Sequence, residues 1–202
     1  MSLILASASP RRAELLRQIG VDFEVAAAHI DESVMPGEPA TDYVKRMARQ
    51  KALATQKNLD KAGERVVLGA DTCVICDDHI LGKPADEEAC IEMLELLSAR
   101  EHQVLSAICI LQGNNQHLAV SESHVAFRVI SRAEAALYWA TGEPRDKAGG
   151  YGIQGLASVF VSELRGSYSG VMGLPLFETA QLLAKCGVGF WQSRISQKEV
   201  QD

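Results

Sequence analysis

The sequence predicts an α/β protein in which a mixed sheet is flanked by helices. Strand-like and helix-like segments mix along the whole chain without repeats, as expected when helices cover a sheet. Two pairs of strand-like runs are separated by short polar turns, at Asp77-Asp78 and at Gly113-Asn114-Asn115. Because such turns join antiparallel strands and helical crossovers join parallel ones, we expect both kinds of pairing in the sheet.

In the first half of the chain, apolar runs and turn residues predict four strands and two helices. Gly20 is placed to end the first helix, and Thr41 is placed to cap the second. Val66–Cys76 is a long apolar run that is typical of a buried strand. The predicted elements are a strand over Leu3–Ala6, a helix from Ser9 to about Ile19, a strand over Phe23–Ala27, a helix from Thr41 to about Leu59, and strands over Val66–Cys76 and His79–Gly82.

The second half is predicted to contain three helices and three strands. Ser131 and Glu134 have the spacing of a capping box at the start of a helix. No linker rich in proline, glycine or serine divides the chain, so residues 1–192 are expected to form one domain and residues 193–202 a polar C-terminal tail. The predicted elements are a helix over Asp86–Leu97, strands over Gln103–Gln112 and Leu118–Val129, a helix over Ser131–Thr141, a strand near Ser158–Leu164 and a helix over about Leu174–Lys185.

Composition and charge restrict the classes of function. The 202 residues are 47% apolar and 23% charged, which is ordinary for a globular protein, and the formal net charge is -6. Binding to nucleic acid is not expected, because it needs clustered lysines and arginines. No segment reaches the roughly 18 uninterrupted apolar residues that a membrane span requires. The apolar N-terminus is too short for a signal peptide, so we expect a cytoplasmic protein.

The five cysteines are predicted to be buried thiols. Cys73 and Cys76 form a C-x-x-C, which could mark a metal knuckle or a redox pair. Both lie in a strand-like run, where an offset of three residues sends the side chains to opposite faces. No second pair exists to complete a zinc site, and buried thiols suit a reducing cytosol.

The segment Ser7-Ala8-Ser9-Pro10-Arg11-Arg12 is the first candidate site. Ser9 suits an N-cap and Pro10 the first helical position, which puts Arg11 and Arg12 in the first turn. The helix dipole disfavours cations there by roughly 0.3–1 kcal/mol each, so a docked phosphate would explain both arginines. Two solvated arginines on a surface helix explain them equally well.

Two charged residues interrupt apolar patterns. Lys51 lies on the apolar stripe that Val44 and Met47 mark along their helix, so it either extends to water or reaches an internal anion. Asp71 lies within the Val66–Cys76 strand, where a carboxylate needs a cation, a metal or several hydrogen-bond donors. Both residues are therefore candidates for a site.

The predicted hairpin supplies one candidate cation for Asp71. A symmetric turn centred on Asp77-Asp78 places Thr72 opposite Lys83. Asp71 and Lys83 would then be close, provided that a bulge at a neighbouring glycine turns them to the same face. A purely structural ion pair is the alternative.

The segment Asp146–Gly155 contains a G-x-G-x-x-G motif formed by Gly150, Gly152 and Gly155. A dinucleotide site requires this motif to follow a strand and to open a helix. Here a helix precedes the motif and a strand follows it, so we reject a Rossmann oxidoreductase. A backbone that a ligand can approach closely remains, with an ordinary glycine-rich loop as the alternative.

Five segments, taken together and in this order, resemble the Maf family of nucleoside triphosphate pyrophosphatases over about Leu3 to Leu183. The resemblance implies a Maf/ITPase-like fold with two lobes around a nucleotide-binding cleft. It also implies a divalent metal cation, Mg²⁺ or Mn²⁺, and a homodimer. The segments are Ser7-Ala8-Ser9-Pro10-Arg11-Arg12, Gly69-Ala70-Asp71-Thr72, Gly82-Lys83-Pro84, Asp146-Lys147-Ala148-Gly149-Gly150-Tyr151-Gly152-Ile153-Gln154-Gly155 and Val171-Met172-Gly173-Leu174-Pro175-Leu176.

The resemblance also implies roles for individual residues. Asp71 would accept a proton from the attacking water, and Glu32 and Asp71 would hold the metal. Arginines and lysines would hold the triphosphate, while the amide of Gln154 would match the N3–H and carbonyl edge of uracil or thymine. The catalytic positions are Asp71, Lys83, Lys51 and Glu32, and the substrate-binding positions are Ser7, Arg11, Arg12, Thr72 and Gln154.

Gly-Ala-Asp-Thr together with Tyr-Gly-Ile-Gln resembles the branch of the family that acts on dTTP and UTP. The implied function is hydrolysis of these nucleotides to the monophosphate and diphosphate, and of modified pyrimidine nucleotides as house-cleaning. Two alternatives stay open. One is a pyrophosphatase for non-canonical purine nucleotides such as ITP, and the other is a non-catalytic nucleotide-binding regulator of cell division.

Overall fold

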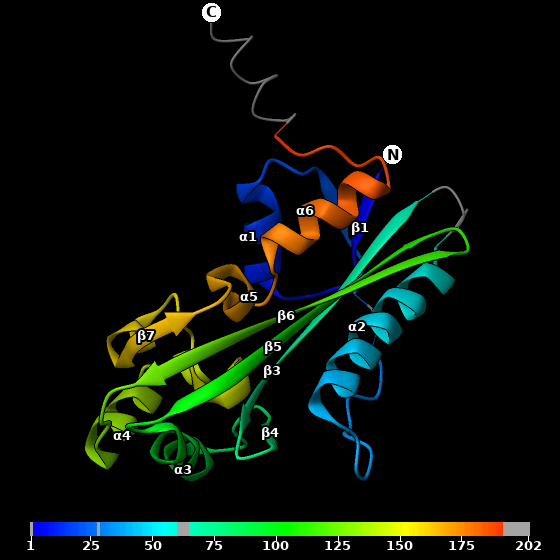
Figure 1. Ribbon diagram of the computed structural model, residues 1–202. Coiled ribbons are helices and arrows are strands. Elements are labelled where there is room, and N and C mark those ends of the chain that lie inside the picture. Colours follow the sequence, from blue (N-terminus) through cyan, green and yellow to red (C-terminus); the bar gives the residue numbers. More distant parts are fainter. Residues whose placement is uncertain (1, 28, 60–64, 192–202) are drawn as a thin grey trace, which may run out of the picture. The chain divides into compact units, whose positions relative to one another are not determined.

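The computed structural model describes residues 2–27, 29–59 and 65–191. Within these residues seven strands form one sheet in the order β2-β1-β3-β5-β6-β7, with β4 paired to β3 (Figure 1). β1 is parallel to β2 and to β3. β4 pairs antiparallel with β3, and β7 pairs antiparallel with β6, so the predicted mixed sheet is confirmed. The strands are β1 (Leu3–Leu5), β2 (Phe23–Val25), β3 (Val66–Cys76), β4 (His79–Leu81), β5 (Glu101–Gln112), β6 (Asn115–Phe127) and β7 (Val161–Arg165).

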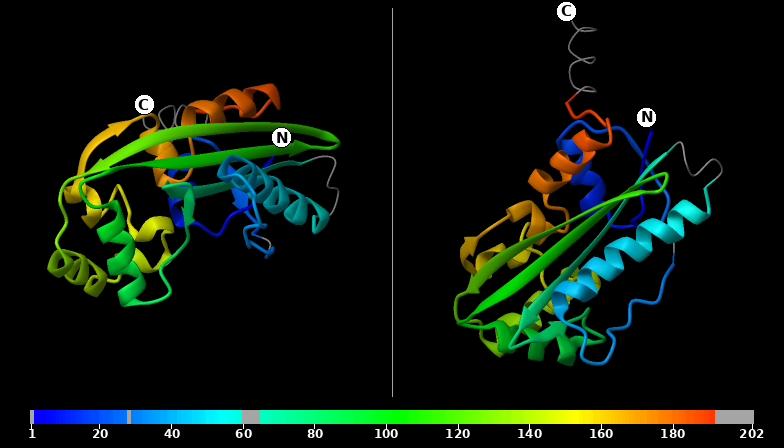
Figure 2. Two further views of the ribbon diagram at one scale, coloured as in Figure 1. Left: turned by 60° about the horizontal axis from the view of Figure 1, so that its bottom comes forward. Right: turned by 45° about the vertical axis from the view of Figure 1, so that its right-hand side comes forward.

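The chain divides into two compact units, and each is described by itself. The first unit comprises the described residues within Met1–Asp71, Ala107–Val120 and Gly173–Asp202. Its helices are α1 (Pro10–Gln18), α2 (Ala40–Lys57) and α6 (Leu176–Lys185). Within this unit α2 and α6 lie on opposite sides of the sheet (Figure 2). β1 is therefore covered on both faces, which agrees with its three fully buried residues.

The second unit comprises Thr72–Ser106 and Ser121–Met172. Two of its helices, α3 (Glu87–Leu97) and α4 (Arg132–Ala140), pack against each other. Their apolar faces join residues of β3, β5 and β6 in one core that includes Leu94, Val104 and Phe127. The short helix α5 (Tyr168–Met172) and three 3₁₀ helices complete the unit, and these are η2 (Glu143–Asp146), η3 (Ala148–Gly150) and η4 (Leu156–Phe160).

The helix α2 approaches the strand β3 very closely at Gly69. A Cβ at this position would lie 2.2 Å from the carbonyl oxygen of Ala48 and 2.8 Å from the backbone nitrogen of Ala52. Both of these atoms belong to the α2 backbone, which cannot move aside as a side chain can. Gly69 therefore permits this contact, and the α2 residues Val44 and Met47 are fully buried.

The hairpin of β3 and β4 has the predicted register. Val74 pairs with Leu81 and Cys76 with His79, across a turn in which Asp77 and Asp78 have φ of 49° and 63°. Two positive φ angles are typical of a type I′ turn, whose twist matches that of the flanking strands. The pairing ends at Leu81, one residue earlier than predicted.

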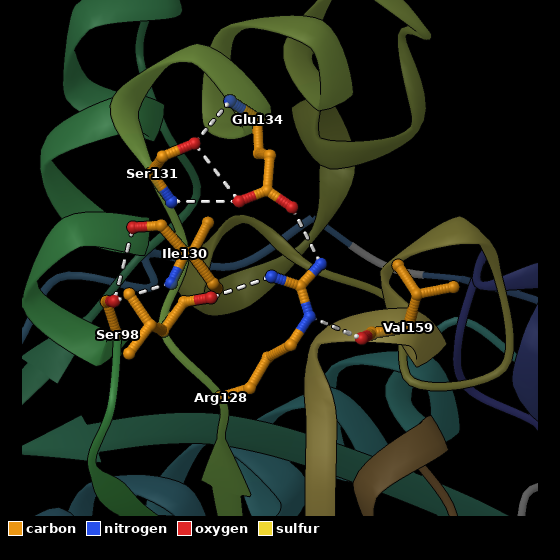
Figure 3. A network of polar contacts seen from close by, with 7 residues as sticks. Ser98, Arg128, Ile130, Ser131, Glu134 and Val159 are labelled. Carbon is orange, nitrogen blue, oxygen red and sulfur yellow. Dashed lines mark hydrogen bonds and ion pairs between the residues drawn. The ribbon is translucent and has the colours of Figure 1, made fainter.

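The predicted capping box at the start of α4 is confirmed (Figure 3). The Ser131 hydroxyl accepts from the Glu134 backbone N–H at 3.3 Å, and the Glu134 carboxylate accepts from the Ser131 backbone N–H at 3.0 Å. Arg128 donates to the other carboxylate oxygen of Glu134 at 2.8 Å and to the carbonyl of Val159 at 3.0 Å. The network thereby ties the start of α4 to the end of η4.

Several predicted element ends were wrong. α2 begins at Ala40 with Pro39 as N-cap, because the Pro39 carbonyl accepts from two N–H groups of the first turn, so Thr41 lies inside the helix. Ser9 caps α1 without a side-chain hydrogen bond. β7 begins three residues later than predicted, since Leu156–Phe160 is a 3₁₀ helix. The predicted polar tail, residues 193–202, lies outside the described residues.

The state of the cysteines and the absence of a membrane-spanning segment were also predicted from the sequence. All five cysteines are buried thiols, as expected, so the C-x-x-C at Cys73 and Cys76 is no disulfide. Among the described residues, no helix combines the length and apolar character that crossing a membrane requires. The prediction of one domain over residues 1–192 stays a prediction.

Candidate active site

The centre of the candidate site is an ion-pair cluster in the first unit. The ammonium nitrogen of Lys51, on α2, lies 2.7 Å from Asp71 Oδ1 on β3 and 2.8 Å from Glu32 Oε1. Asp71 is 7% exposed, whereas half of the Glu32 side chain is exposed. Of the two alternatives for Lys51, the structure therefore shows the second, in which its ammonium group reaches anions.

The need of Asp71 for a cation is also confirmed, but the partner is Lys51. The sequence suggested Lys83 on the basis of the hairpin register. The β3–β4 ladder ends at Leu81, so Lys83 lies beyond it in an exposed loop. Asp71 instead shares a face of β3 with Gly69, two residues before it, and at Gly69 that face contacts α2. The close approach at Gly69 thus brings the Lys51 side chain within reach of Asp71.

Burial dominates the electrostatics of Asp71. Desolvation raises the pKa of this carboxyl above its ordinary value, although the positive charges of Lys51 and Arg12 oppose the shift. A carboxylate with a raised pKa holds a proton more readily than a surface aspartate does. That property suits a group that must accept a proton during a reaction.

The loop that carries Glu32 is attached to α2 by two other side chains. The Tyr43 hydroxyl donates to the Glu32 carbonyl at 3.1 Å, and Arg46 donates to the Ser33 carbonyl at 2.9 Å. Arg46 also binds both carboxylate oxygens of Glu38 at 2.6 Å each. Tyr43 and Arg46 therefore place Glu32 above the same helix that carries Lys51. Neither residue was predicted from the sequence.

Arg12 is buried, so the alternative of two solvated arginines was wrong for this residue. It donates to the Ser7 hydroxyl at 3.0 Å and to the Gly173 carbonyl at 2.8 Å. Burial lowers the pKa of Arg12, with the charges of Asp71 and Glu32 acting in the opposite direction. Arg11 is partly exposed in the first turn of α1. The structure thus brings Ser7 and Arg12 together in the unit that contains Asp71.

The carboxylates of Glu32 and Asp71 fit a hard divalent cation. Both contact one ammonium nitrogen, so the two contacting oxygens lie near each other. Mg²⁺ commonly binds through one or two carboxylates and completes its coordination with water and substrate phosphates. Among the described residues there is no group of three or more histidine, cysteine or acidic side chains that could hold a metal. A two-carboxylate set is consistent with that mode of binding.

Three predicted site residues belong to the second unit, and Thr72 is the first. Its hydroxyl lies 2.7 Å from the hydroxyl of Ser106, which donates to the Gly170 carbonyl at 2.6 Å. Because the single proton of Ser106 is used on Gly170, Thr72 is the donor of the first bond. Ser106 was not predicted from the sequence, although a serine inside an apolar strand is a visible signal.

Lys83 and Gln154 lie on two loops of the second unit that contact each other. The Gly149 N–H donates to the Gly82 carbonyl at 3.0 Å, next to Lys83. Gln154 is exposed in a turn that the Gly155 N–H closes on the Gly152 carbonyl at 3.0 Å. Close approach of a ligand to this glycine-rich backbone stays a prediction.

Comparison with known proteins gives one family and several similar proteins. A family model described as Maf-like protein matches residues 2–186. A protein of Colwellia psychrerythraea named dTTP/UTP pyrophosphatase is 54% identical over 92% of this chain and 88% of its own length. Proteins with the same name from Alcanivorax borkumensis and Methylobacillus flagellatus are 51% and 53% identical, over 95% and 92% of this chain and 99% and 93% of their own.

A solved structure, that of the Staphylococcus aureus Ham1 protein, is 16% identical and covers 65% of this chain and 73% of that one. Its TM-score is 0.40, too low to support any conclusion about this chain.

Proposed function

Because this chain belongs to the Maf family, we propose that it hydrolyses dTTP and UTP to the nucleoside monophosphate and diphosphate. The observation that carries the proposal is the cluster of Glu32, Lys51 and buried Asp71, in a chain similar to proteins named dTTP/UTP pyrophosphatase. We extend the proposal to modified pyrimidine nucleotides that share the same base edge.

The reaction joins a water oxygen to the α-phosphorus and breaks the bond from that phosphorus to the oxygen that bridges to the β-phosphate. Asp71 would accept the proton of the water, and the electron pair of the broken bond leaves with diphosphate. Lys51, Arg11 and Arg12 in the first unit and Lys83 in the second would stabilise the negative charge on phosphate oxygens. Ser7 would bind the substrate beside Arg12. This assignment rests on the raised pKa of Asp71 and on the family resemblance.

Glu32 and Asp71 would hold Mg²⁺ or Mn²⁺. Such an ion supplies positive charge to phosphate oxygens and lowers the pKa of water. The two carboxylates are hard oxygen donors, which supports this assignment. We expect a chelator to abolish turnover and added Mg²⁺ or Mn²⁺ to restore it. Equal turnover with and without the chelator would argue against the metal.

Selection of the base is assigned to Gln154, together with Thr72 and Arg11. A carboxamide both donates and accepts, so it can pair with the N3–H and the carbonyl of uracil or thymine. Adenine and cytosine lack a ring N–H beside a carbonyl, and the 2′-hydroxyl would not be recognised if both dTTP and UTP are substrates. The exposure of Gln154 on a closed turn supports this role.

The first test is diphosphate release from dTTP, UTP, CTP, dCTP, ATP, GTP, ITP and 7-methyl-GTP with Mg²⁺ or Mn²⁺. Release from dTTP and UTP alone is the expected result. Preference for ITP would keep the reaction and replace the substrate. Nucleotide binding without release from any of them would support a non-catalytic regulator instead.

A homodimer and a cytoplasmic location complete the proposal, and both rest on the resemblance and the composition. Light scattering of the purified protein would give the mass of the assembly directly. A mass of 21.9 kDa at all concentrations would contradict the dimer.

A further inference from the structure

Glu143 in the second unit accepts three hydrogen bonds. Its Oε1 accepts from the Tyr138 hydroxyl at 2.8 Å and from the Ala157 N–H at 3.4 Å, and its Oε2 accepts from the Leu156 N–H at 2.9 Å. Although burial acts to raise the pKa of Glu143, the hydrogen bonds outweigh it and the pKa lies below its ordinary value. At neutral pH Glu143 is therefore a carboxylate, and both of its oxygens accept hydrogen bonds.

Tyr138 links Glu143 to the start of residues 152–157, whose other end Glu143 itself binds. Its hydroxyl, 2.8 Å from Glu143, accepts from the Gly152 N–H at 3.2 Å. Burial raises the pKa of Tyr138, so the phenol stays protonated and donates to Glu143. Together Glu143 and Tyr138 hold both ends of residues 152–157, on either side of Gln154.

The two glycines of this segment lie in close contact with the side chains of Glu143 and Lys147. A Cβ at Gly155 would lie 2.3 Å from Glu143 Oε2, and one at Gly152 would lie 2.8 Å from Lys147 Cε. The Lys147 ammonium in turn donates to the Glu143 carbonyl. The turn that bears Gln154 is thus packed directly on Glu143 and Lys147, with no side chain between them.

Gln154 is presented outward from a buried framework. Tyr151 and Ile153, on its N-terminal side, are each 5% exposed, whereas Gln154 is exposed. The Tyr151 hydroxyl lies 2.8 Å from Nε2 of the buried His102, which fixes the start of the segment. The backbone around Gln154 is therefore held at three places before any ligand binds.

We propose that Glu143 is a positioning residue for Gln154, and that through this turn it sets the selection of uracil and thymine over cytosine. The inference rests on the proposed function, because it takes Gln154 as the group that contacts the base. Cytosine differs from thymine and uracil at this edge, since it carries an amino donor in place of the carbonyl acceptor. An amide can distinguish the two bases only if its oxygen and nitrogen stand in fixed places.

The test compares kcat/KM for dTTP and for dCTP in the wild type, Glu143→Gln and Tyr138→Phe. The carboxamide in Glu143→Gln has one acceptor oxygen, so its amino group would face at least one of the three donors. Tyr138→Phe removes a single hydroxyl and serves if Glu143→Gln does not fold. Glu92→Gln, an exposed glutamate on α3, is the matched control.

We expect each of the two variants to lower the ratio of kcat/KM for dTTP to kcat/KM for dCTP by about tenfold or more. The main cause should be a higher KM for dTTP. Glu92→Gln should keep the wild-type ratio. In a Gln154→Ala background, Glu143→Gln should change the ratio little further, because coupled residues are not additive. An equal loss for dTTP and dCTP, an unchanged ratio, or a full effect without Gln154 would each overturn the inference.

Hydrogen exchange without nucleotide separates this inference from the proposed function. If the wild type itself does not prefer dTTP to dCTP, the proposed base selection is wrong. In that case the hydrogen-exchange rates of the amides of residues 152–157 still test whether Glu143 positions the turn. Faster exchange of these amides in Glu143→Gln than in Glu92→Gln would support positioning of the turn, and unchanged exchange would reject it.

Discussion

At the scale of single residues, Asp71 is subject to two opposing effects, burial and the positive charge of Lys51. Its carboxylate is buried beside Lys51, and burial disfavours the charged form, which raises the pKa. A buried ion pair contributes little to stability because desolvation offsets the attraction. We infer that this position is maintained for its chemistry and that a neutral residue of the same shape would fold at least as well.

Replacement of Asp71 by asparagine tests that inference. Asp71→Asn should reduce turnover of dTTP by about 10²–10⁴-fold, the usual contribution of a general base. The midpoint of thermal unfolding should stay equal to that of the wild type or rise, since Lys51 retains Glu32 as its partner. Turnover would be measured by diphosphate release and unfolding by circular dichroism.

Asp78→Asn is the matched control, because Asp78 is exposed in the hairpin turn and asparagine tolerates its φ of 63°. It should leave turnover unchanged. Near-normal turnover in Asp71→Asn would remove Asp71 from its proposed role.

At the scale of elements, the contact of α2 with β3 determines whether Lys51 reaches Asp71. Gly69→Ala places a methyl group 2.2 Å from the Ala48 carbonyl oxygen, so the helix must shift outward. Overpacking of this kind costs about 1–3 kcal/mol. We expect a loss of about 2 kcal/mol in the free energy of unfolding, measured in urea, and a fall in turnover.

Gly82→Ala is the control for stability, because a Cβ at Gly82 meets nothing within 4 Å. Its free energy of unfolding should equal that of the wild type. If Gly69→Ala were as stable as Gly82→Ala, the close approach of α2 would not be the constraint that the distances indicate.

The capping box of α4 makes a prediction about pH (Figure 3). Hydrogen bonds from Arg128, and then from Ser131, lower the pKa of Glu134 from 4.5 to about 2. A lowered pKa in the folded state means that the contribution of Glu134 is present above about pH 4.5 and is lost as the pH falls towards 2. Glu134→Ala should therefore unfold at a lower temperature than the wild type at pH 7.

The difference between Glu134→Ala and the wild type should shrink steadily below pH 4.5, as followed by calorimetry. A difference that is the same at pH 7 and at pH 3 would show that the ionised carboxylate does not stabilise the start of α4.

At the scale of the whole molecule, much of the fold follows from local patterns in the sequence. Apolar runs and turn residues predicted the strands and helices, and the two aspartates predicted the register of the β3–β4 hairpin. The inward direction of Lys51 followed from its helical spacing. Periodicity carries these signals because each depends on residues close together in the chain.

The contacts that complete the site depend on residues far apart, and these could not be predicted. Lys51 meets Asp71 because α2 packs on β3, a packing that no local pattern encodes. Arg12 binds the carbonyl of Gly173, and a backbone carbonyl gives no signal of its own in the sequence. Ser106 is the exception, since a serine within an apolar strand invites the search for a partner.

The distribution of thiols gives a prediction for the folded chain as a whole. All five cysteines are buried, and burial raises the pKa of Cys90 and of Cys109 to about 11. Only thiolates react readily with disulfide reagents, so the native protein should react slowly at pH 8. In urea all five thiols per chain should react at once, as read from the absorbance of the released thiolate. Rapid labelling of the native protein would contradict their burial.

The contact at Gly69 also restricts which amino-acid substitutions the protein tolerates at this position. Every missense change in a glycine codon adds a side chain, and here the first added carbon already collides with the α2 backbone. Larger side chains should collide more severely than the methyl group of alanine. A library of all replacements at this codon, selected for activity, should be strongly enriched in glycine, while at Gly82, next to the catalytic candidate Lys83, alanine should be returned as often as glycine.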